Sequence, residues 1–390
     1  MTPAARVQTA IELLDRILAG EPAERALTLW ARASRYAGSG DRAAVRDLVY
    51  DALRCRRSLA AKAGGAETTG RALMIALTDP EKRDALFAGL PHGPAPLTEA
   101  ERVSRPAPLA EFPDPVRLDY PDWLDRLLRN SLGEAFEPVL SAMQRRAPVF
   151  LRVNVARTTP AEAMAILSLD GIESCPAPGC ETALEVAGKA NRINGSRAYL
   201  QGLVELQDLS SQAAVAELPL GKGMKVLDYC AGGGGKALAM AARTGGRIDA
   251  HDANPGRMRD LPARAKRAGV DIRLMDSTAL GPGAYDLVLV DAPCSGSGTW
   301  RRTPQSKWLL TPERLAELTG LQQQILSAAT HHLRPGGTLA YMTCSLLSAE
   351  NEAVIAAFLG TQPAFSLKHE LRFLPTGGGD GFYLAVLSRT

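Results

Sequence analysis

Apolar residues recur at helical spacing through the first 88 positions of the chain. The pattern predicts four helices, the first with Thr2-Pro3 as its start and Gly20 as its stop. We expect the third to run as one helix to Gly64-Gly65. The apolar positions that mark the four helices are, in chain order, Val7, Ile11, Leu14 and Leu18; Ala26, Leu29 and Trp30; Val45, Leu48, Val49, Ala52 and Leu53; and Leu73, Ile75, Leu77 and Leu86. Residues 1–88 are therefore predicted to form an all-helical domain.

Three arginines, Arg54, Arg56 and Arg57, follow the apolar stripe of the third helix. Cations at a helix carboxyl end are typical of a solvated terminus, where they complement the macrodipole. The same cluster suits contacts with RNA phosphates. The sequence leaves both interpretations open.

A proline-rich stretch, predicted to be a linker over residues 89–121, separates this domain from the rest of the chain. Proline breaks helices and stiffens extended chain. Leu109, Phe112 and Leu118 within the stretch favour a linker that packs along a surface. The prolines are Pro91, Pro94, Pro96, Pro106, Pro108, Pro113, Pro115 and Pro121.

Residues 122–205 are predicted to form a small α/β unit. Thr159-Pro160-Ala161-Glu162 is a capping box with proline at the first helical position, opening a helix through Leu169. The other expected elements are a helix from Trp123 to about Arg145, a strand over 149–155, and short strands around Leu184 and Val204.

Strand and helix patterns alternate through residues 206–390, which is the signature of a doubly wound parallel sheet. We therefore predict an α/β, Rossmann-like domain. The expected strands are 225–230, 247–253, 271–276, 285–292, 338–344 and 382–387, with helices such as 312–333 and 349–359 between them.

A glycine loop follows the first of these strands. Glycines there let backbone amides approach a ligand at a helix N-terminus. Cys230 and Ala237 stand where a P-loop needs Gly and Ser or Thr, so an ATPase is not expected. Asp252 and Asp276 end the next two strands, placed for ribose hydroxyls and an adenine amino group. The combination predicts an adenosine-type ligand.

Two cysteines stand at the ends of later strands. Cys294 follows Asp291-Ala292-Pro293, and Cys344 lies in Thr343-Cys344-Ser345. Ligands bind outside the carboxyl ends of parallel strands, so both thiols should face the cleft. A thiolate nucleophile suits an electron-poor ring carbon. Cys175 and Cys180 have no histidine partners nearby in the sequence, and no metal site is expected.

Each of the two cysteine motifs is followed along the chain by further characteristic residues. They resemble those of the Sun-type (RsmB-like) RNA cytosine-5 methyltransferases, and the resemblance spans nearly the whole chain. The segment Gly40-Asp41-Arg42, with Leu48-Val49-Tyr50 and Leu53-Arg54, is similar to the NusB-like helical domain of the RsmB branch. The other matching segments are Asp291–Gly298, Arg302-x-Pro304-x-x-Lys307-Trp308, Thr343–Ser345 with Glu350-Asn351-Glu352, Asp380–Tyr383, Gln207–Gln212 and Arg152–Asn154.

The resemblance implies S-adenosylmethionine as methyl donor and RNA as partner. Cys344 would add to carbon 6 of an unstacked cytosine, and Cys294 would assist product release. Asp291 would hydrogen-bond the N3/N4 edge of the base, and Lys236 would lie close to base and cofactor. The implied cofactor site comprises Cys230, Ala231, Gly232, Gly233, Gly234, Gly235, Lys236, Asp252, Asp276 and Asp291.

One departure concerns the glycine loop. The family's loop normally reads Cys-Ala-Ala-Pro-Gly-Gly-Lys-Thr, whereas residues 230–237 here read Cys-Ala-Gly-Gly-Gly-Gly-Lys-Ala. Without the proline the loop is more flexible, so ordering it on binding costs more entropy. We expect weaker cofactor affinity rather than its loss.

The amino-acid composition indicates the broad class of protein and little more. A net charge of +3 is too balanced to establish nucleic-acid binding, and 46% apolar residues argue against disorder. The chain has 36 Arg and only 9 Lys, a bias that either phosphate recognition or codon usage would explain. With no apolar run near 18 residues and no signal-peptide pattern at the start, we expect a cytoplasmic protein without membrane contact.

Small-subunit ribosomal RNA is the expected substrate, with transfer RNA as the alternative. A non-catalytic RNA-binding or ribosome-assembly factor would explain the altered loop, but both cysteines and the three acids remain. A DNA or small-molecule methyltransferase would not need the two accessory domains. We expect a monomer.

Overall fold

The computed structural model describes residues 1–64, 68–103 and 108–390, and the chain divides into two compact units. The helical unit consists of Met1–Arg146 and Trp300–Leu310, and the sheet unit consists of Ala147–Thr299 and Thr311–Thr390. The division cuts across the predicted domain limits. Residues 122–146 group with the N-terminal helices, and so does a segment from within the predicted catalytic domain.

The N-terminal residues are helical as predicted, but two of the expected helices are each divided. The third ends at Cys55, where the backbone leaves helical geometry (φ −110°), and a separate helix follows. The fourth is interrupted by Asp79-Pro80, since proline favours the start of a new helix. Gly65 lies outside the described residues. The helices are α1 (Pro3–Leu18), α2 (Ala23–Ala33), α3 (Ser39–Arg54), α4 (Arg56–Lys62), α5 (Gly70–Leu77) and α6 (Pro80–Leu86).

The proline-rich stretch is not an extended linker. It contains short helices, and its prolines Pro108 and Pro113 stand at the N-caps of two of them. Leu118 and Tyr120 are buried, so the segment packs within the helical unit. Pro106 lies outside the described residues. The elements are α7 (Glu99–Val103), η1 (Leu109–Glu111) and α8 (Asp114–Arg117).

The single helix expected from Trp123 to Arg145 is also divided. Gly133 adopts a positive φ of 52° and ends its first part. The elements are η2 (Asp122–Leu124), α9 (Asp125–Leu132), η3 (Gly133–Ala135) and α10 (Phe136–Met143).

The sheet unit begins with a small antiparallel sheet of strand order β2-β3-β1-β4. The predicted capping box is confirmed, because the Glu162 N–H donates to Thr159 Oγ1 at 3.3 Å and the Thr159 N–H to Glu162 Oε2 at 2.9 Å. Strand β2 was not predicted because it is a largely exposed edge strand without an apolar alternation. The elements are β1 (Phe150–Val153), α11 (Pro160–Leu169), β2 (Glu173–Pro176), β3 (Ala183–Ala187), η4 (Ala190–Gly195), α12 (Arg197–Leu200) and β4 (Val204–Leu206).

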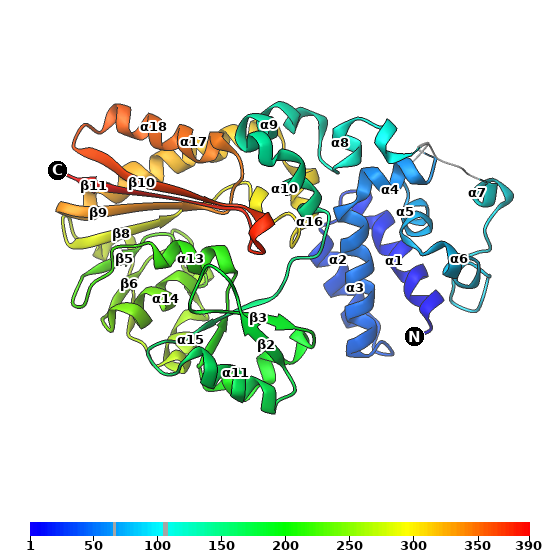
Figure 1. Ribbon diagram of the computed structural model, residues 1–390, viewed down its shortest axis with the longest axis horizontal. Coiled ribbons are helices and arrows are strands. Elements are labelled where there is room, and N and C mark those ends of the chain that lie inside the picture. Colours follow the sequence, from blue (N-terminus) through cyan, green and yellow to red (C-terminus); the bar gives the residue numbers. More distant parts are fainter. Residues whose placement is uncertain (65–67, 104–107) are drawn as a thin grey trace. The chain divides into compact units, whose positions relative to one another are not determined.

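The larger sheet has seven strands in the order β10-β11-β9-β8-β5-β6-β7. Strands β5 to β9 pair in parallel, and β11 and β10 add to β9 in antiparallel fashion as the red edge in Figure 1. The doubly wound prediction is confirmed, whereas β10, with Lys368, His369 and Glu370 in its middle, was missed. The strands are β5 (Val226–Asp228), β6 (Ile248–Ala250), β7 (Ile272–Leu274), β8 (Tyr285–Asp291), β9 (Leu333–Thr343), β10 (Phe365–Phe373) and β11 (Phe382–Arg389).

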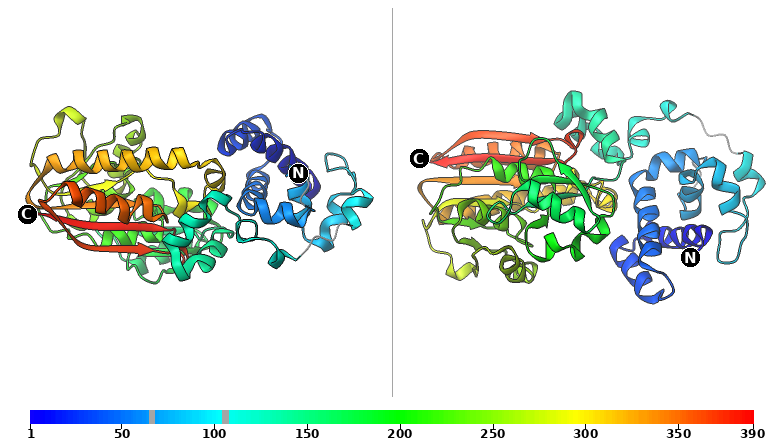
Figure 2. Two further views of the ribbon diagram at one scale, coloured as in Figure 1. Left: turned by 90° about the horizontal axis from the view of Figure 1, so that it is seen from above. Right: turned by 60° about the horizontal axis from the view of Figure 1, so that its bottom comes forward.

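Helices cover both faces of this sheet (Figure 1 and Figure 2). Leu287 and Leu289 of β8 face a core shared with α13 (Leu209–Ala216), α14 (Gly235–Thr244) and α15 (Leu261–Ala268). Val288 and Val290 face the opposite core, which α17 and α18 close. A strand buried on both faces reads as a continuous apolar run, which explains why β8 was predicted well. Helix α17 is Pro312–Ala329 and α18 is Glu352–Thr361, so the predicted ends at 333 and 349 are corrected.

The parallel strands place the carboxyl ends of β5, β6, β8 and β9 at one edge of the sheet. The loops that follow these strands carry the predicted chemistry. In the described residues, no helix is both long and apolar enough to cross a membrane.

Candidate active site at the carboxyl edge of the sheet

The two predicted cysteines meet at this edge. Cys294 follows β8 and Cys344 follows β9, and their Sγ atoms lie 3.4 Å apart. A disulfide requires about 2.05 Å, so both thiols are free. The hydrogen bond with Cys344, together with burial, raises the pKa of Cys294 well above its ordinary value. Cys294 therefore keeps its proton, and either sulfur can donate the hydrogen bond that joins the two thiols.

Close backbone packing brings the two cysteine loops together. The Gly298 N–H donates to the Cys344 carbonyl at 2.9 Å, and the Gly381 N–H donates to the Gly298 carbonyl at 2.9 Å. A Cβ on Gly298 would lie 2.0 Å from the Gly381 oxygen. Only glycine permits this approach at position 298.

An ion pair joins the end of β8 to the start of α14. Lys236 Nζ lies 2.5 Å from Asp291 Oδ2 and 5.1 Å from the ring centroid of Phe382. Burial disfavours the charged form of Lys236. The charge of Asp291 and its hydrogen bond favour that form more strongly, so the pKa of Lys236 is raised. The structure therefore brings two of the predicted site residues together as an ion pair with a charged lysine, a contact that the sequence did not predict.

The glycine loop is closed by the loop after β6. Asp252 is buried, and its carboxylate accepts hydrogen bonds from the N–H groups of Gly232 and Asn254, both at 2.9 Å. Gly234 has a φ of 78°, and a Cβ there would lie 2.2 Å from Leu261 Cδ1. The glycine at 234 is therefore required both by backbone conformation and by the close packing of α15.

Asp276 stands apart from this arrangement. It is exposed at the N-cap of the 3-10 turn Ser277–Ala279, two residues after β7 ends. Its role toward an adenine ring stays a prediction.

Sequence comparisons place the chain in a family. The model described as 16S rRNA methyltransferase RsmB/F matches residues 215–388, and that of the RsmF/B-like ferredoxin-like domain matches residues 120–192. Ribosomal RNA small subunit methyltransferase B of Vibrio cholerae is 34% identical over 292 residues, 71% of this chain and 67% of that protein. The protein of the same name from Klebsiella pneumoniae is 34% identical over 298 residues, with 72% and 68% covered.

This chain belongs to the RsmB/F family of ribosomal RNA methyltransferases. The resemblance predicted from the cysteine motifs is thereby confirmed, and the family's cofactor is S-adenosylmethionine.

Among solved structures, the crystal structure of PH0851 has a TM-score of 0.77 at 22% identity, covering 100% of this chain and 99% of that one. A methyltransferase homolog from Pyrococcus horikoshii has a TM-score of 0.62 at 26% identity, covering 71% and 98%.

A buried carboxylate in this RsmB/F chain fits the cofactor. Asp228, the last residue of β5, is 1% exposed, and neither of its carboxylate oxygens has a hydrogen-bond partner in the structure. Burial, with repulsion from Asp291, raises its pKa to about 7. S-adenosylmethionine carries an ammonium and a sulfonium, and an unpaired acid beside a glycine loop suits such a cation.

Sequence reasoning missed three residues of the site. Asp228 could have been noticed as an acid in a buried strand directly before the glycine loop. Arg152 of β1, which the sequence marked only as part of the Arg152–Asn154 motif, donates to the Gly235 carbonyl at 2.6 Å and ties the small sheet to the glycine loop. Glu350 was only part of a quoted motif, and it bonds to both cysteine loops. The roles of Arg152 and Glu350 depend on contacts between segments that are far apart in the chain, so the sequence alone does not show them.

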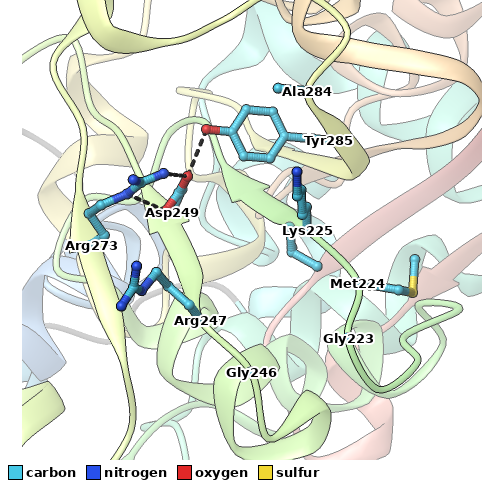
Figure 3. Close-up of a pocket in the computed structure, with 10 residues that line it drawn as sticks. Gly223, Met224, Lys225, Gly246, Arg247, Asp249, Arg273, Ala284 and Tyr285 are labelled. Atoms are coloured by element: carbon cyan, nitrogen blue, oxygen red, sulfur yellow. Dashed lines mark hydrogen bonds and ion pairs between the residues drawn. The ribbon is translucent and has the colours of Figure 1, made fainter.

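A cavity of about 360 Å³ lies at the opposite, amino ends of the strands (Figure 3). Within it Arg273 forms an ion pair with Asp249, which also accepts a hydrogen bond from Tyr285 Oη at 2.8 Å. Because the predicted catalytic residues lie at the carboxyl ends, this cavity is separate from the candidate active site.

The arginine cluster does not form a solvated helix end. Arg54 is buried and donates to the Arg301 carbonyl at 2.6 Å, and Arg56 lies 5.4 Å from the ring centroid of Trp308. Arg57 donates to Asp122 Oδ1 at 2.9 Å. All three arginines are engaged within the helical unit, which argues against the RNA-contact interpretation as well.

Proposed function

We propose that this protein transfers a methyl group from S-adenosylmethionine to carbon 5 of a cytosine in small-subunit ribosomal RNA. The observation that carries the proposal is the contact between Cys294 and Cys344 at the strand ends where the glycine loop and the Lys236–Asp291 pair also lie. Membership of an rRNA methyltransferase family supports the substrate class.

Bound S-adenosylmethionine supplies the methyl group. The Cys344 thiolate adds to carbon 6 of the cytosine, which makes carbon 5 nucleophilic enough to accept a methyl. Asp291 faces the N3/N4 edge of the base, where its carboxylate accepts a hydrogen bond from the N4 amino group and fixes the orientation of the ring for addition. Lys236 holds the Asp291 carboxylate in place from the start of α14.

The reaction ends when the carbon-5 proton is lost and the bond between carbon 6 and the Cys344 sulfur breaks. Cys294, which retains its proton, assists this step from 3.4 Å away. We assign RNA contacts to the ferredoxin-like and helical parts, because the base must be unstacked and held before it can enter such a site.

The direct test is methylation in vitro with isotope-labelled S-adenosylmethionine and purified small-subunit rRNA, with transfer RNA as the competing substrate. Bisulfite sequencing and nucleoside mass spectrometry then identify the product. We expect 5-methylcytosine at a single position of the rRNA. A labelled atom other than cytosine carbon 5, or label in transfer RNA alone, would contradict the proposal.

A further inference from the structure

A buried carboxylate joins the two cysteine loops. Glu350 is fully buried in the 3-10 turn Ser348–Glu350 that follows β9. Its Oε1 accepts hydrogen bonds from the Ser295 N–H at 2.7 Å and from Gln322 Nε2 at 3.1 Å. Its Oε2 accepts from the hydroxyls of Ser295 and Ser345, each at 2.5 Å. Four donors offset the cost of burying this charge.

The two serines are the residues directly after the two cysteines. Ser295 follows Cys294, and Ser345 follows Cys344. One carboxylate therefore fixes the distance between the two backbone segments that carry the thiols. Among the described residues Glu350 forms no ion pair, so its attachments are to these loops and to Gln322 of α17.

A second set of hydrogen bonds supports the same junction. Ser297 Oγ lies 2.9 Å from Ser345 Oγ and accepts from the Leu346 N–H at 2.8 Å. Asn351 Nδ2 donates to the Ser345 carbonyl at 3.0 Å. The side chains of Ser297, Ser345 and Asn351 are buried and hydrogen-bonded, and buried hydrogen bonds of this kind favour a single arrangement of the backbone.

We propose that Glu350 is a positioning residue that holds the sulfurs of Cys294 and Cys344 in contact for the release step. The proposal rests on the covalent function proposed above. In that step the carbon-5 proton passes to solvent water and its electron pair forms the C5=C6 bond. The C6–S bond breaks, and its electron pair stays on the Cys344 sulfur. The Cys294 S–H stabilises this thiolate through a hydrogen bond.

The separation of the two sulfurs is measured by their oxidation with diamide. The two thiols lose two protons and two electrons, diamide is reduced to its hydrazine, and a disulfide forms. The sulfurs must meet for this reaction, so Glu350→Ala should slow disulfide formation on the order of tenfold. Peptide mass spectrometry of the cross-linked pair gives the rate. A rate equal to that of the wild type would overturn the proposal.

Matched variants separate positioning from a general loss of stability. Glu350→Gln keeps an acceptor for the Ser295 N–H, and the hydroxyls can accept from its amide, so it should retain most of the wild-type rate. Glu352→Ala removes a carboxylate two residues away that pairs with Arg372, and should leave the rate unchanged. Should Glu350→Ala not fold, the double variant Ser295→Ala/Ser345→Ala removes the two hydroxyl donors and should slow the reaction.

A methylation readout completes the test. In Glu350→Ala the covalent protein–RNA adduct should persist and kcat should fall, while kcat/KM for RNA stays near the wild-type value because addition and methyl transfer precede the slowed step. A normal kcat with slow disulfide formation would overturn the positioning role in release. Failure of the wild-type protein to make 5-methylcytosine would instead overturn the proposed function, and the disulfide rates would still decide whether Glu350 positions the thiols.

Discussion

At the scale of single residues, the site depends on charges held at the ends of β5 and β8. Asp291 is neutralised by Lys236, whereas Asp228 is buried and its carboxylate has no hydrogen-bond partner among the described residues. Cys294, Cys344 and Asp291 could be predicted because strand position and motif both mark them. Asp228 is marked in the sequence only as an acid in a buried strand before the glycine loop, whereas the lack of a hydrogen-bond partner among the described residues appears only after folding.

Asp228 should make stability depend on pH. Its pKa rises from 3.8 to about 7 because of burial and the Asp291 charge. Below about pH 4 folded and unfolded chains both hold the proton, and between pH 4 and 7 only the unfolded chain loses it. Stability should therefore fall across this window by on the order of 4 kcal/mol and stay lower above it.

Asp228→Asn should flatten that profile, because the amide does not titrate. Chemical denaturation followed by far-UV circular dichroism at pH 5 and pH 8 measures the difference. Asp276→Asn, which alters an exposed carboxylate of the same unit, should retain the wild-type profile. Parallel profiles for wild type and Asp228→Asn would exclude this role.

At the scale of elements, the loops at the carboxyl ends of the parallel strands carry the candidate active-site residues. This placement could be predicted from the alternation of strands and helices and from the glycines after β5. What the sequence does not show is how loops meet. The closure of the glycine loop by Asp252, the support of Gly235 by Arg152 and the bridging by Glu350 all join segments far apart in the chain.

The glycine loop gives a test at this scale. Gly234→Ala should weaken S-adenosylmethionine affinity tenfold or more, because a positive φ costs a non-glycine residue about 1–2 kcal/mol and the Cβ also meets Leu261. Gly245→Ala at the other end of α14 is the control, since it has a φ of 63° but no atom within 4 Å of the added Cβ. Titration calorimetry should show weaker binding in the first variant only. Equal affinities would mean that the loop geometry is not needed for the cofactor.

At the scale of the whole molecule, the chain enters the helical unit twice. The segment Trp300–Leu310, with α16 (Pro304–Leu309), lies between β8 and α17 in sequence but belongs to the helical unit. Lys307 donates to the Arg54 carbonyl at 3.1 Å and Trp308 to the Leu53 carbonyl at 2.8 Å. Composition does not change at either end of this segment, so a boundary there could not be predicted.

Neutralising the arginine cluster should therefore affect stability more than RNA binding. In Arg54→Ala/Arg56→Ala/Arg57→Ala the Arg301 carbonyl loses a buried donor, at about 1–3 kcal/mol, whereas the loss of the exposed Arg57–Asp122 pair costs about 0–1 kcal/mol. The melting temperature should fall, while the dependence of RNA affinity on salt stays unchanged.

A control variant neutralises three exposed arginines of the same unit, Arg25, Arg32 and Arg35. Its melting temperature should match that of the wild type. A flatter salt dependence in the cluster variant with an unchanged melting temperature would restore the RNA-contact interpretation.

The most direct test of the account is the covalent intermediate. Target RNA and S-adenosylmethionine are incubated with Cys294→Ala or Cys344→Ala, and the products are resolved on a denaturing gel. Cys294→Ala still adds to the base and methylates it but releases it slowly, so a shifted protein–RNA band should accumulate. Cys344→Ala lacks the nucleophile and should give none. A band from Cys344→Ala alone would reverse the roles, and wild-type turnover in both variants without a band would contradict the covalent mechanism.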